Sequence, residues 1–285
     1  MLDWIYDLLG TVLYWFSNLF FGKYAFGLLL YALLFKLLFL PFSIKQQKSQ
    51  IAMAKFAPKM EAIQAKYKGK TDELSMQKQQ RELMELQQKE GFRPFGGCLP
   101  LLLQLPIITF LYNVIRSPLS HICKLSADEI TRIKDIIMMA GMTPAADEIG
   151  LVANIQAVGI DSFSGIDLSK LPDFTLFGTN FALKPSFSEI SILWLVPVLA
   201  AALTWLSSYL IRKWNNANPS QGAGGQNKQM KATMNSMDLI MPLMTLWMTF
   251  SFSGMLGVYW IYQSILGILQ AFILAKAMPI PKRRT

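Results

Sequence analysis

The stretch from Tyr24 to Lys45 reads YAFGLLLYALLFKLLFLPFSIK and is apolar enough to cross a lipid bilayer. A membrane-spanning helix needs about 20 apolar residues, each adding about 1.5 Å of rise. Lys36 lies within the stretch, nine positions before Lys45, which corresponds to about 13 Å of helix. An ammonium at that depth in hydrocarbon is costly, so it normally faces protein or a wet cavity. The stretch therefore predicts a water-filled, positively charged recess inside a helical membrane protein.

The composition of the whole chain agrees with a membrane protein. Of its 285 residues, 53% are hydrophobic and 16% are charged, whereas soluble domains carry about 25% charged residues. The net charge of +9 favours an anionic partner such as lipid headgroups, ribosomal RNA or acidic protein segments. A single histidine, His121, argues against histidine-based catalysis, and we expect no metal. Cys98 and Cys123 have no metal-binding spacing, and we predict no disulfide between them.

The N-terminal segment, residues 1–20, is predicted to be an amphipathic helix lying along the membrane surface. Asp3 and Asp7 stand one helical turn apart among tryptophan, leucine and isoleucine residues, a pattern typical of interfacial helices. A signal peptide is the alternative interpretation. The acidic start, which lacks the basic region of signal peptides, argues against it.

Apolar runs predict an all-α polytopic fold with five transmembrane helices around a hydrophilic groove open to the cytoplasm. Pro41 should bend or end the first span, and Pro197 should kink the third. A tight turn over residues 251–257 separates the last two spans. The five predicted spans are residues 24–44, 96–116, 188–211, 237–252 and 255–275.

The segments between the spans differ in composition. Residues 45–95 are rich in Gln, Lys, Glu and Met, with a break at 69–71, and predict an antiparallel helical hairpin. Residues 117–187 are polar and mixed, with a short helix at 127–139 and an irregular loop from 161 onward. Residues 212–236 are a Gly/Asn/Gln-rich linker, and residues 276–285 form a basic tail.

The distribution of charge predicts the orientation in the membrane. The 45–93 segment carries eleven Lys and Arg residues, and the linker and the tail carry four each. The 117–190 segment carries five, against nine acidic residues. Because cytoplasmic loops are enriched in Lys and Arg, we expect the hairpin, linker and tail in the cytoplasm. Five spans then place the N-terminus outside and the C-terminus in the cytoplasm.

Three motifs occur in order along the chain: KLLFLP at 36–41, GCLPLLLQLPI at 97–107, and GVYWIY at 257–262 followed by Gln270. Together with the charged hairpin, they resemble the YidC/Oxa family of membrane protein insertases over about residues 20–276. The large periplasmic domain of Gram-negative members is missing, as in the short form usual in Gram-positive bacteria. The family most often has arginine where Lys36 stands and asparagine where Ser264 falls.

The resemblance implies a non-enzymatic insertase in the bacterial plasma membrane, without cofactor or nucleotide. The sequence leaves the oligomeric state open, and we expect the monomer to be functional. Its implied partners are nascent membrane proteins and membrane lipids, together with the ribosome and the Sec translocon. It implies a groove open to the cytoplasm and to lipid but closed toward the outside. Polar or motif positions in the spans give the candidate groove residues: Lys36, Gln104, Thr109, Asn113, Trp260, Gln263 and Ser264.

Each feature also has a plainer interpretation. Lys36 can snorkel toward the interface, and Gln104, Thr109 and Asn113 can form interhelical hydrogen bonds instead of lining a groove. The basic tail can bind anionic lipid, ribosomal RNA or both. A methionine stripe can serve packing or line a deformable substrate path; it comprises Met234, Met237, Met241, Met244 and Met248.

Two other functions remain open at this point. One is a small-molecule transporter or channel with an anion site at Lys36, although the sequence has no inverted repeats of the transporter kind. The other is an assembly factor that only chaperones membrane proteins.

Overall fold

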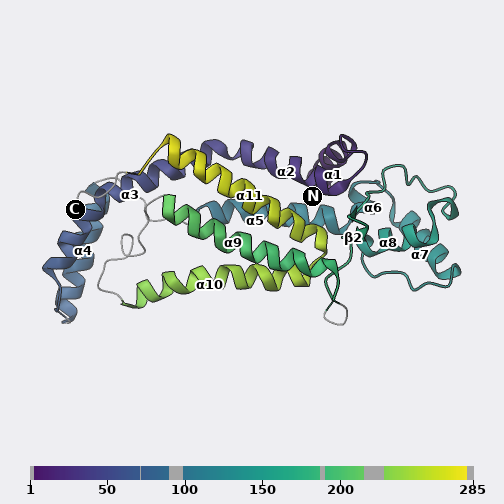
Figure 1. The fold of residues 1–285 in the computed structure, drawn as a ribbon. Coiled ribbons are helices and arrows are strands. Elements are labelled where there is room, and N and C mark those ends of the chain that lie inside the picture. Colours follow the sequence, from purple (N-terminus) through teal and green to yellow (C-terminus); the bar gives the residue numbers. More distant parts are fainter. Residues whose placement is uncertain (1–2, 71, 90–98, 187–189, 215–227, 281–285) are drawn as a thin grey trace.

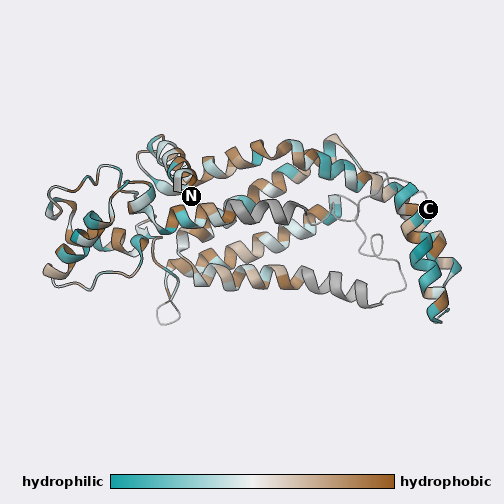
Figure 2. Cartoon of the chain, turned by 180° about the vertical axis from the view of Figure 1, so that it is seen from behind, coloured by the Kyte–Doolittle hydropathy of each residue, from teal (hydrophilic) through white to brown (hydrophobic). Residues whose placement is uncertain are grey.

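The computed structural model describes residues 3–70, 72–89, 99–186, 190–214 and 228–280, and every structural statement below refers to these residues. Figure 1 shows an elongated molecule in which long helices run side by side. A small domain lies at one end of this bundle and a pair of helices lies at the other. Hydrophobic residues dominate the bundle, and hydrophilic ones gather on the helix pair (Figure 2). The chain is an all-α membrane protein.

The predicted interfacial segment forms helix α1 (Asp3–Asn18). In Figure 1 it is seen almost end-on beside the start of α2 (Tyr24–Leu38). Leu13 and Ser17 are buried, whereas Trp4, Leu8 and Trp15 are exposed. At 100° per residue these exposed side chains lie within about 40° of one another, so α1 has an exposed apolar face opposite its buried one.

The first predicted span, 24–44, is divided in the structure. Helix α2 ends at Leu38, and after Phe39 helix α3 (Leu40–Lys66) begins at an angle of 55° to it. Pro41 lies in the first turn of α3, where a helix does not use the missing N–H. The bend agrees with the expectation that Pro41 bends or ends the first span, whereas the end of the span at 44 stays a prediction. Pro41 starts a new helix, which continues without interruption into the segment predicted as the hairpin.

Helix α3 packs against α4 (Glu73–Lys89) to form the helix pair at one end of the molecule. Lys66 Nζ lies 2.6 Å from Glu82 Oε1, and the Tyr67 hydroxyl donates to the same oxygen at 2.7 Å. One carboxylate thus receives two donors from the end of α3, which links the two helices.

Four further helices complete the bundle: α5 (Leu99–Arg116), α9 (Leu195–Trp214), α10 (Lys228–Ser251) and α11 (Gly254–Ala277). The short 3-10 helix η3 (Ile192–Trp194) precedes α9. Helix α11 packs mainly on α9 and α2, and α10 packs on α9. Among the described residues, 192–214 and 254–277 are long and apolar enough to cross a membrane. The bent pair α2–α3 makes a third candidate if it is one broken span.

The segment at 117–187 was predicted to be a loop with one helix, and this is only partly right. Helix α7 (Ala127–Met139) has the predicted bounds, with a capping box at Ser126 and Glu129. The sequence analysis missed α6 (Pro118–His121), α8 (Glu148–Val158) and the 3-10 helix η2 (Ile160–Ser162). It also missed a two-residue antiparallel pair, β1 (Thr175–Leu176) and β2 (Thr179–Asn180).

This small domain has buried apolar residues of its own, which is why the segment folds instead of remaining a loop. Ile133, Ile137, Val152, Ile155 and Phe174 are all completely buried. Cys123 is a buried free thiol, and burial raises its pKa to about 12. The other cysteine, Cys98, lies outside the described residues.

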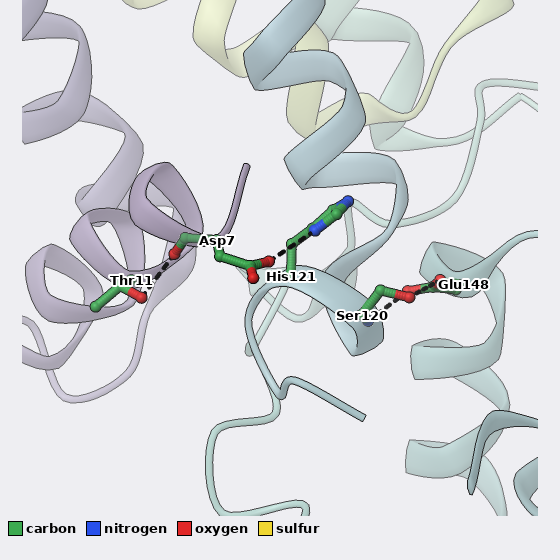
Figure 3. A network of polar contacts seen from close by, with 5 residues as sticks. All are labelled: Asp7, Thr11, Ser120, His121 and Glu148. Atoms are coloured by element: carbon green, nitrogen blue, oxygen red, sulfur yellow. Dashed lines mark hydrogen bonds and ion pairs between the residues drawn. The ribbon is translucent and has the colours of Figure 1, made fainter. Parts of the chain in front are cut away.

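Polar contacts attach the small domain to the rest of the molecule. Figure 3 shows Asp7 of α1 facing His121 of α6, with 3.1 Å between Oδ1 and Nδ1. Beside His121, the backbone N–H and the hydroxyl of Ser120 donate to the Glu148 carboxylate of α8 at 2.8 and 2.6 Å. The α1, α6 and α8 helices are therefore held together by a chain of side-chain contacts.

Candidate functional site

A recess with a volume of about 290 Å³ lies within the bundle and is lined by α2, α5, α9 and α11. The helices contribute side chains of different kinds: one cation, several hydroxyls, an amide, aromatic rings and two isoleucines. The lining residues are Lys36, Ile108, Thr204, Ser207, Ser208, Ile211, Tyr259, Trp260, Gln263, Ser264 and Gly267.

Lys36 is the charged residue of this recess. It lies in the last turn of α2 and is half-buried. A Cβ built on Gly267 would lie 3.5 Å from Lys36 Nζ, so the ammonium occupies the space above the side-chain-free Gly267 of α11. Among the described residues Lys36 forms no ion pair. Within the described part of the chain, this positive charge inside an apolar bundle therefore has no counter-charge.

Helix α11 supplies a face of aromatic and polar groups to the recess. Tyr259, Trp260, Gln263, Ser264 and Gly267 follow at positions i, i+1, i+4, i+5 and i+8, which share one side of a helix. Gln263 Nε2 donates to the Tyr259 hydroxyl at 2.8 Å. This bond fixes the amide nitrogen of Gln263 against the ring hydroxyl of the preceding turn.

Helix α9 supplies hydroxyl groups that the sequence analysis did not select. Thr204, Ser207, Ser208 and Ile211 line the recess at i, i+3, i+4 and i+7. The signal was present in the sequence, because three hydroxyl residues at this spacing form a polar stripe on an apolar helix. Thr204 Oγ1 already donates to the carbonyl of Ala200 at 2.8 Å, as hydroxyls in apolar helices commonly do.

The structure brings four of the seven predicted groove residues together: Lys36, Trp260, Gln263 and Ser264. Thr109 and Asn113 do not line the recess. Thr109 is exposed, and Asn113 Nδ2 donates to the Thr109 carbonyl at 2.8 Å, so the amide nitrogen is bonded within α5 itself. Ile108 is the α5 residue that lines the recess. The side chain of Gln104 lies outside the described residues.

The described members of the methionine stripe do not line this recess either. Met241 and Met244 are exposed on α10, and α10 contributes no lining residue. The side chains of Met234 and Met237 lie outside the described residues. Much of the motif at 97–107 does too, because residues 97–98 are not described and only the backbone is described from 99 to 107.

The chemistry available in the recess is that of binding. It offers a cation, hydroxyls and an amide to a polar guest, next to rings and aliphatic side chains. In the described part of the chain, no group of three His, Cys, Asp or Glu side chains is placed to hold a metal ion.

The sequence profile of the family described as "60Kd inner membrane protein" matches residues 15–282, which is nearly the whole chain. The chain belongs to the YidC/Oxa family of membrane protein insertases. This family is not an enzyme family.

Individual YidC/Oxa relatives match over most of their length. "Membrane protein insertase YidC 1" of Listeria monocytogenes serotype 4b is 30% identical over 266 residues, covering 93% of this chain and 69% of the relative. "Membrane protein insertase YidC" of Oceanobacillus iheyensis is 29% identical over 260 residues, covering 91% and 77%. "Membrane protein insertase MisCA" of Bacillus subtilis is 25% identical over 252 residues, covering 88% and 70%.

Proposed function

We propose that this YidC/Oxa chain integrates newly made membrane proteins into the bacterial plasma membrane, and that the Lys36 recess receives their polar segments. The observation that carries the proposal is the ammonium of Lys36, which lines a recess in the bundle without an ion-pair partner among the described residues. Family membership supports insertion as the activity.

The physical basis is desolvation. A polar segment crossing hydrocarbon loses its water, and this loss opposes the transfer. A recess lined by Ser207, Ser208, Gln263 and Ser264 replaces part of that water with hydroxyl and amide groups. The recess therefore reduces the thickness of hydrocarbon that the polar segment of the substrate has to cross.

The charge of Lys36 adds selectivity to this path. In a low-dielectric surrounding, its field attracts carboxylates more strongly than it would in water. An acidic segment of the substrate supplies the counter-charge that Lys36 does not receive from the described residues. The apolar segment then leaves sideways into lipid, and its transfer into hydrocarbon drives the reaction without nucleotide hydrolysis.

The recess opens to the cytoplasm in this proposal, within five spans that place the N-terminus outside. The α3–α4 pair supports this orientation because it lies at the end of the bundle away from the small domain, and the 45–93 segment that contains it has more Lys and Arg residues than any other loop segment. Cytoplasmic segments are enriched in Lys and Arg. The pair, the linker at 212–236 and the basic tail are then available to the ribosome, to the Sec translocon and to anionic lipids.

The test is insertion of two single-span substrates that differ only in the charge of a short N-terminal tail. In cells depleted of the wild-type chain, we expect Lys36→Ala to slow insertion of the acidic-tailed substrate by about tenfold, since one charge interaction of about 1.4 kcal/mol is lost. The neutral-tailed substrate should be less affected. Lys36→Arg should restore insertion, because the charge remains. Pulse-labelling with protease protection measures both substrates.

The matched control is Lys134→Ala, which removes a lysine from α7 in the small domain and should leave both substrates unaffected. Equal rates for Lys36→Ala and wild type on the acidic substrate would contradict the role of the recess. Normal insertion in the depleted cells would contradict the insertase function itself.

A further inference from the structure

A second cavity lies at the other end of the bundle from the α3–α4 pair and has a volume of about 160 Å³. It is formed where α5 ends, α8 begins and α10 turns into α11, and the segment before α9 also contributes. Its polar lining includes Arg116, Lys184, Asp147, Ser251 and Ser253. We call it the Arg116 cavity.

The charges of the Arg116 cavity favour an anion. Among the described residues, Arg116 and Lys184 make no ion pair. Arg116 Nη1 instead donates to the Tyr112 hydroxyl at 3.2 Å, with its guanidinium over the same ring. The one acidic lining residue, Asp147, accepts from the Gly150 N–H at 3.1 Å as the N-cap of α8. Two cations thus face the cavity against one carboxylate that already has a donor.

The Ser253 hydroxyl completes a set of donors suited to phosphate. Ser253 precedes the first turn of α11, and its hydroxyl makes no helix-capping hydrogen bond. Ser251 is exposed at the end of α10, where its hydroxyl donates to the Trp247 carbonyl at 2.9 Å. Phosphate oxygens accept readily from arginine, lysine and hydroxyl donors.

The surface next to the cavity shows what kind of molecule would carry the phosphate. Ile240, Leu243, Met244 and Trp247 are exposed on α10, and Trp247 is 70% exposed. Because successive residues of a helix are rotated by about 100°, these four side chains cover a sector of about 100° around the α10 axis, and Ser251 falls in the same sector. Helix α10 lies at the edge of the bundle (Figure 1). Its exposed apolar stripe runs along the helix toward Ser251, which lines the cavity. This combination matches an amphiphile with an anionic head and apolar chains.

We propose that the Arg116 cavity binds the headgroup of an anionic phospholipid, whose acyl chains lie along the α10 stripe. The leaflet concerned is the one at the small-domain end of the bundle. The inference goes beyond the proposed function, because it concerns a different cavity and does not depend on what enters the Lys36 recess. A lipid held here would fix the ends of α5, α10 and α11 relative to the small domain.

The test measures lipid binding to the full-length protein in detergent by native mass spectrometry, with dioleoylphosphatidylglycerol as the probe. We expect the double variant Arg116→Gln/Lys184→Gln to bind it about tenfold more weakly at the highest-affinity site, because two charge-assisted contacts are lost. The matched control is Arg132→Gln/Lys134→Gln on α7, which removes the same two residue types elsewhere on the small domain and should bind like wild type.

Two further probes distinguish the source of the phosphate. Glycerol 1-phosphate carries the headgroup without chains and should compete poorly; equal competition would identify a free-anion site and overturn the lipid proposal. Dioleoylphosphatidylcholine carries chains and phosphate without net charge and should bind more weakly. Equal binding would overturn the role of the two cations.

A third variant separates lost binding from lost folding. Ser251→Trp should obstruct the mouth of the cavity without changing its charge, and it should reduce binding while the thermal transition stays near that of wild type. Wild-type binding by Arg116→Gln/Lys184→Gln would overturn the proposal. Lipid binding should also be measured for Lys36→Ala. This variant should bind lipid like wild type even if it no longer inserts substrates, so the lipid proposal and the insertase proposal are tested independently.

Discussion

At the scale of single residues, the packing of the bundle depends on a glycine of α11 as well as on its larger side chains. Gly257 allows α11 to approach α9 closely, because a Cβ on Gly257 would overlap Cγ1 of Val196. Gly267 lies beside the Lys36 ammonium, but a Cβ there would meet Nζ only at 3.5 Å, an ordinary contact distance. Of these two glycines on one helix, only Gly257 is required by the packing.

The Gly257 contact gives a prediction for stability. Gly257→Ala should destabilise the protein by about 1–3 kcal/mol, because overpacking forces α9 and α11 apart. The loss should appear as a lower midpoint of thermal unfolding in detergent. Adding Val196→Ala should recover most of it, since the overlapping methyl group is then removed.

The control for that prediction lies on the same helix. Gly267→Ala adds the same methyl group where the nearest atom, Lys36 Nζ, lies 3.5 Å away at ordinary contact distance. It should therefore unfold near the wild-type temperature. If Gly257→Ala is as stable as wild type, α9 and α11 can move apart without a loss of stability, and the prediction is wrong.

At the scale of elements, the α3–α4 pair is held by an exposed polar contact that depends on pH. The hydrogen bond from Lys66, followed by that from Tyr67, holds the pKa of Glu82 below its ordinary value of 4.5. The hydrogen bond with Glu82 holds the pKa of Lys66 above its ordinary value of 10.5. Both groups are charged between these limits, so the contact is complete across neutral pH.

The sign of each shift sets the expected pH dependence. The contribution of Glu82 is present above pH 4.5 and is lost as pH falls through its lowered pKa. The contribution of Lys66 is present below pH 10.5 and is lost as pH rises through its raised pKa. We therefore expect the two helices to separate more readily at acidic pH, as measured by the distance between spin labels placed on α3 and α4.

Two glutamate variants test this assignment. Glu82→Gln should weaken the contact at neutral pH and remove its acid dependence. Glu85→Gln is the control, because Glu85 pairs with Arg81 within α4 at 3.1 Å. If both variants keep the wild-type pH profile, another group controls the separation of the helices.

At the scale of the whole molecule, the small domain is attached to the first residues of two bundle helices. Lys23 Nζ lies 2.5 Å from Asp173 Oδ2, and the Tyr24 N–H donates to the Asp173 carbonyl at 3.1 Å. At α11, the Gly254 N–H donates to the Leu183 carbonyl and the Met255 N–H to the Phe181 carbonyl, both at 2.9 Å. The domain thereby supplies acceptors to free N–H groups at the starts of α2 and α11.

This attachment predicts an effect of the small domain on the bundle. Asp173→Ala should lower the unfolding temperature by a few degrees, because it removes the partner of Lys23 and the carboxylate that accepts from the Thr175 N–H at 2.7 Å. Asp161→Ala, at an exposed position of η2, is the control and should change little. Equal unfolding temperatures for the two variants would show that the backbone contacts alone hold the domain.

Much of this architecture could be predicted because apolar length and charge are local properties of the chain. The predicted spans overlap helices of the structure, and the polar composition of 45–95 predicts helices α3 and α4. The small domain could not be predicted in this way. Its buried isoleucines on α7 and α8 are few and far apart in sequence, so their common core exists only after folding.

The candidate site likewise has features that are local to one segment and features that exist only after folding. Sequence alone determined that Lys36 lies in an apolar segment and that Trp260, Gln263 and Ser264 follow one another on the last helix, because each is a property of one segment. Only the tertiary structure decided that Ser207 and Ser208 of α9 join Lys36 while Thr109 and Asn113 of α5 do not. The reason is rotational: a helix can turn any of its faces toward a neighbour, and the packing of all the helices together selects which face is used.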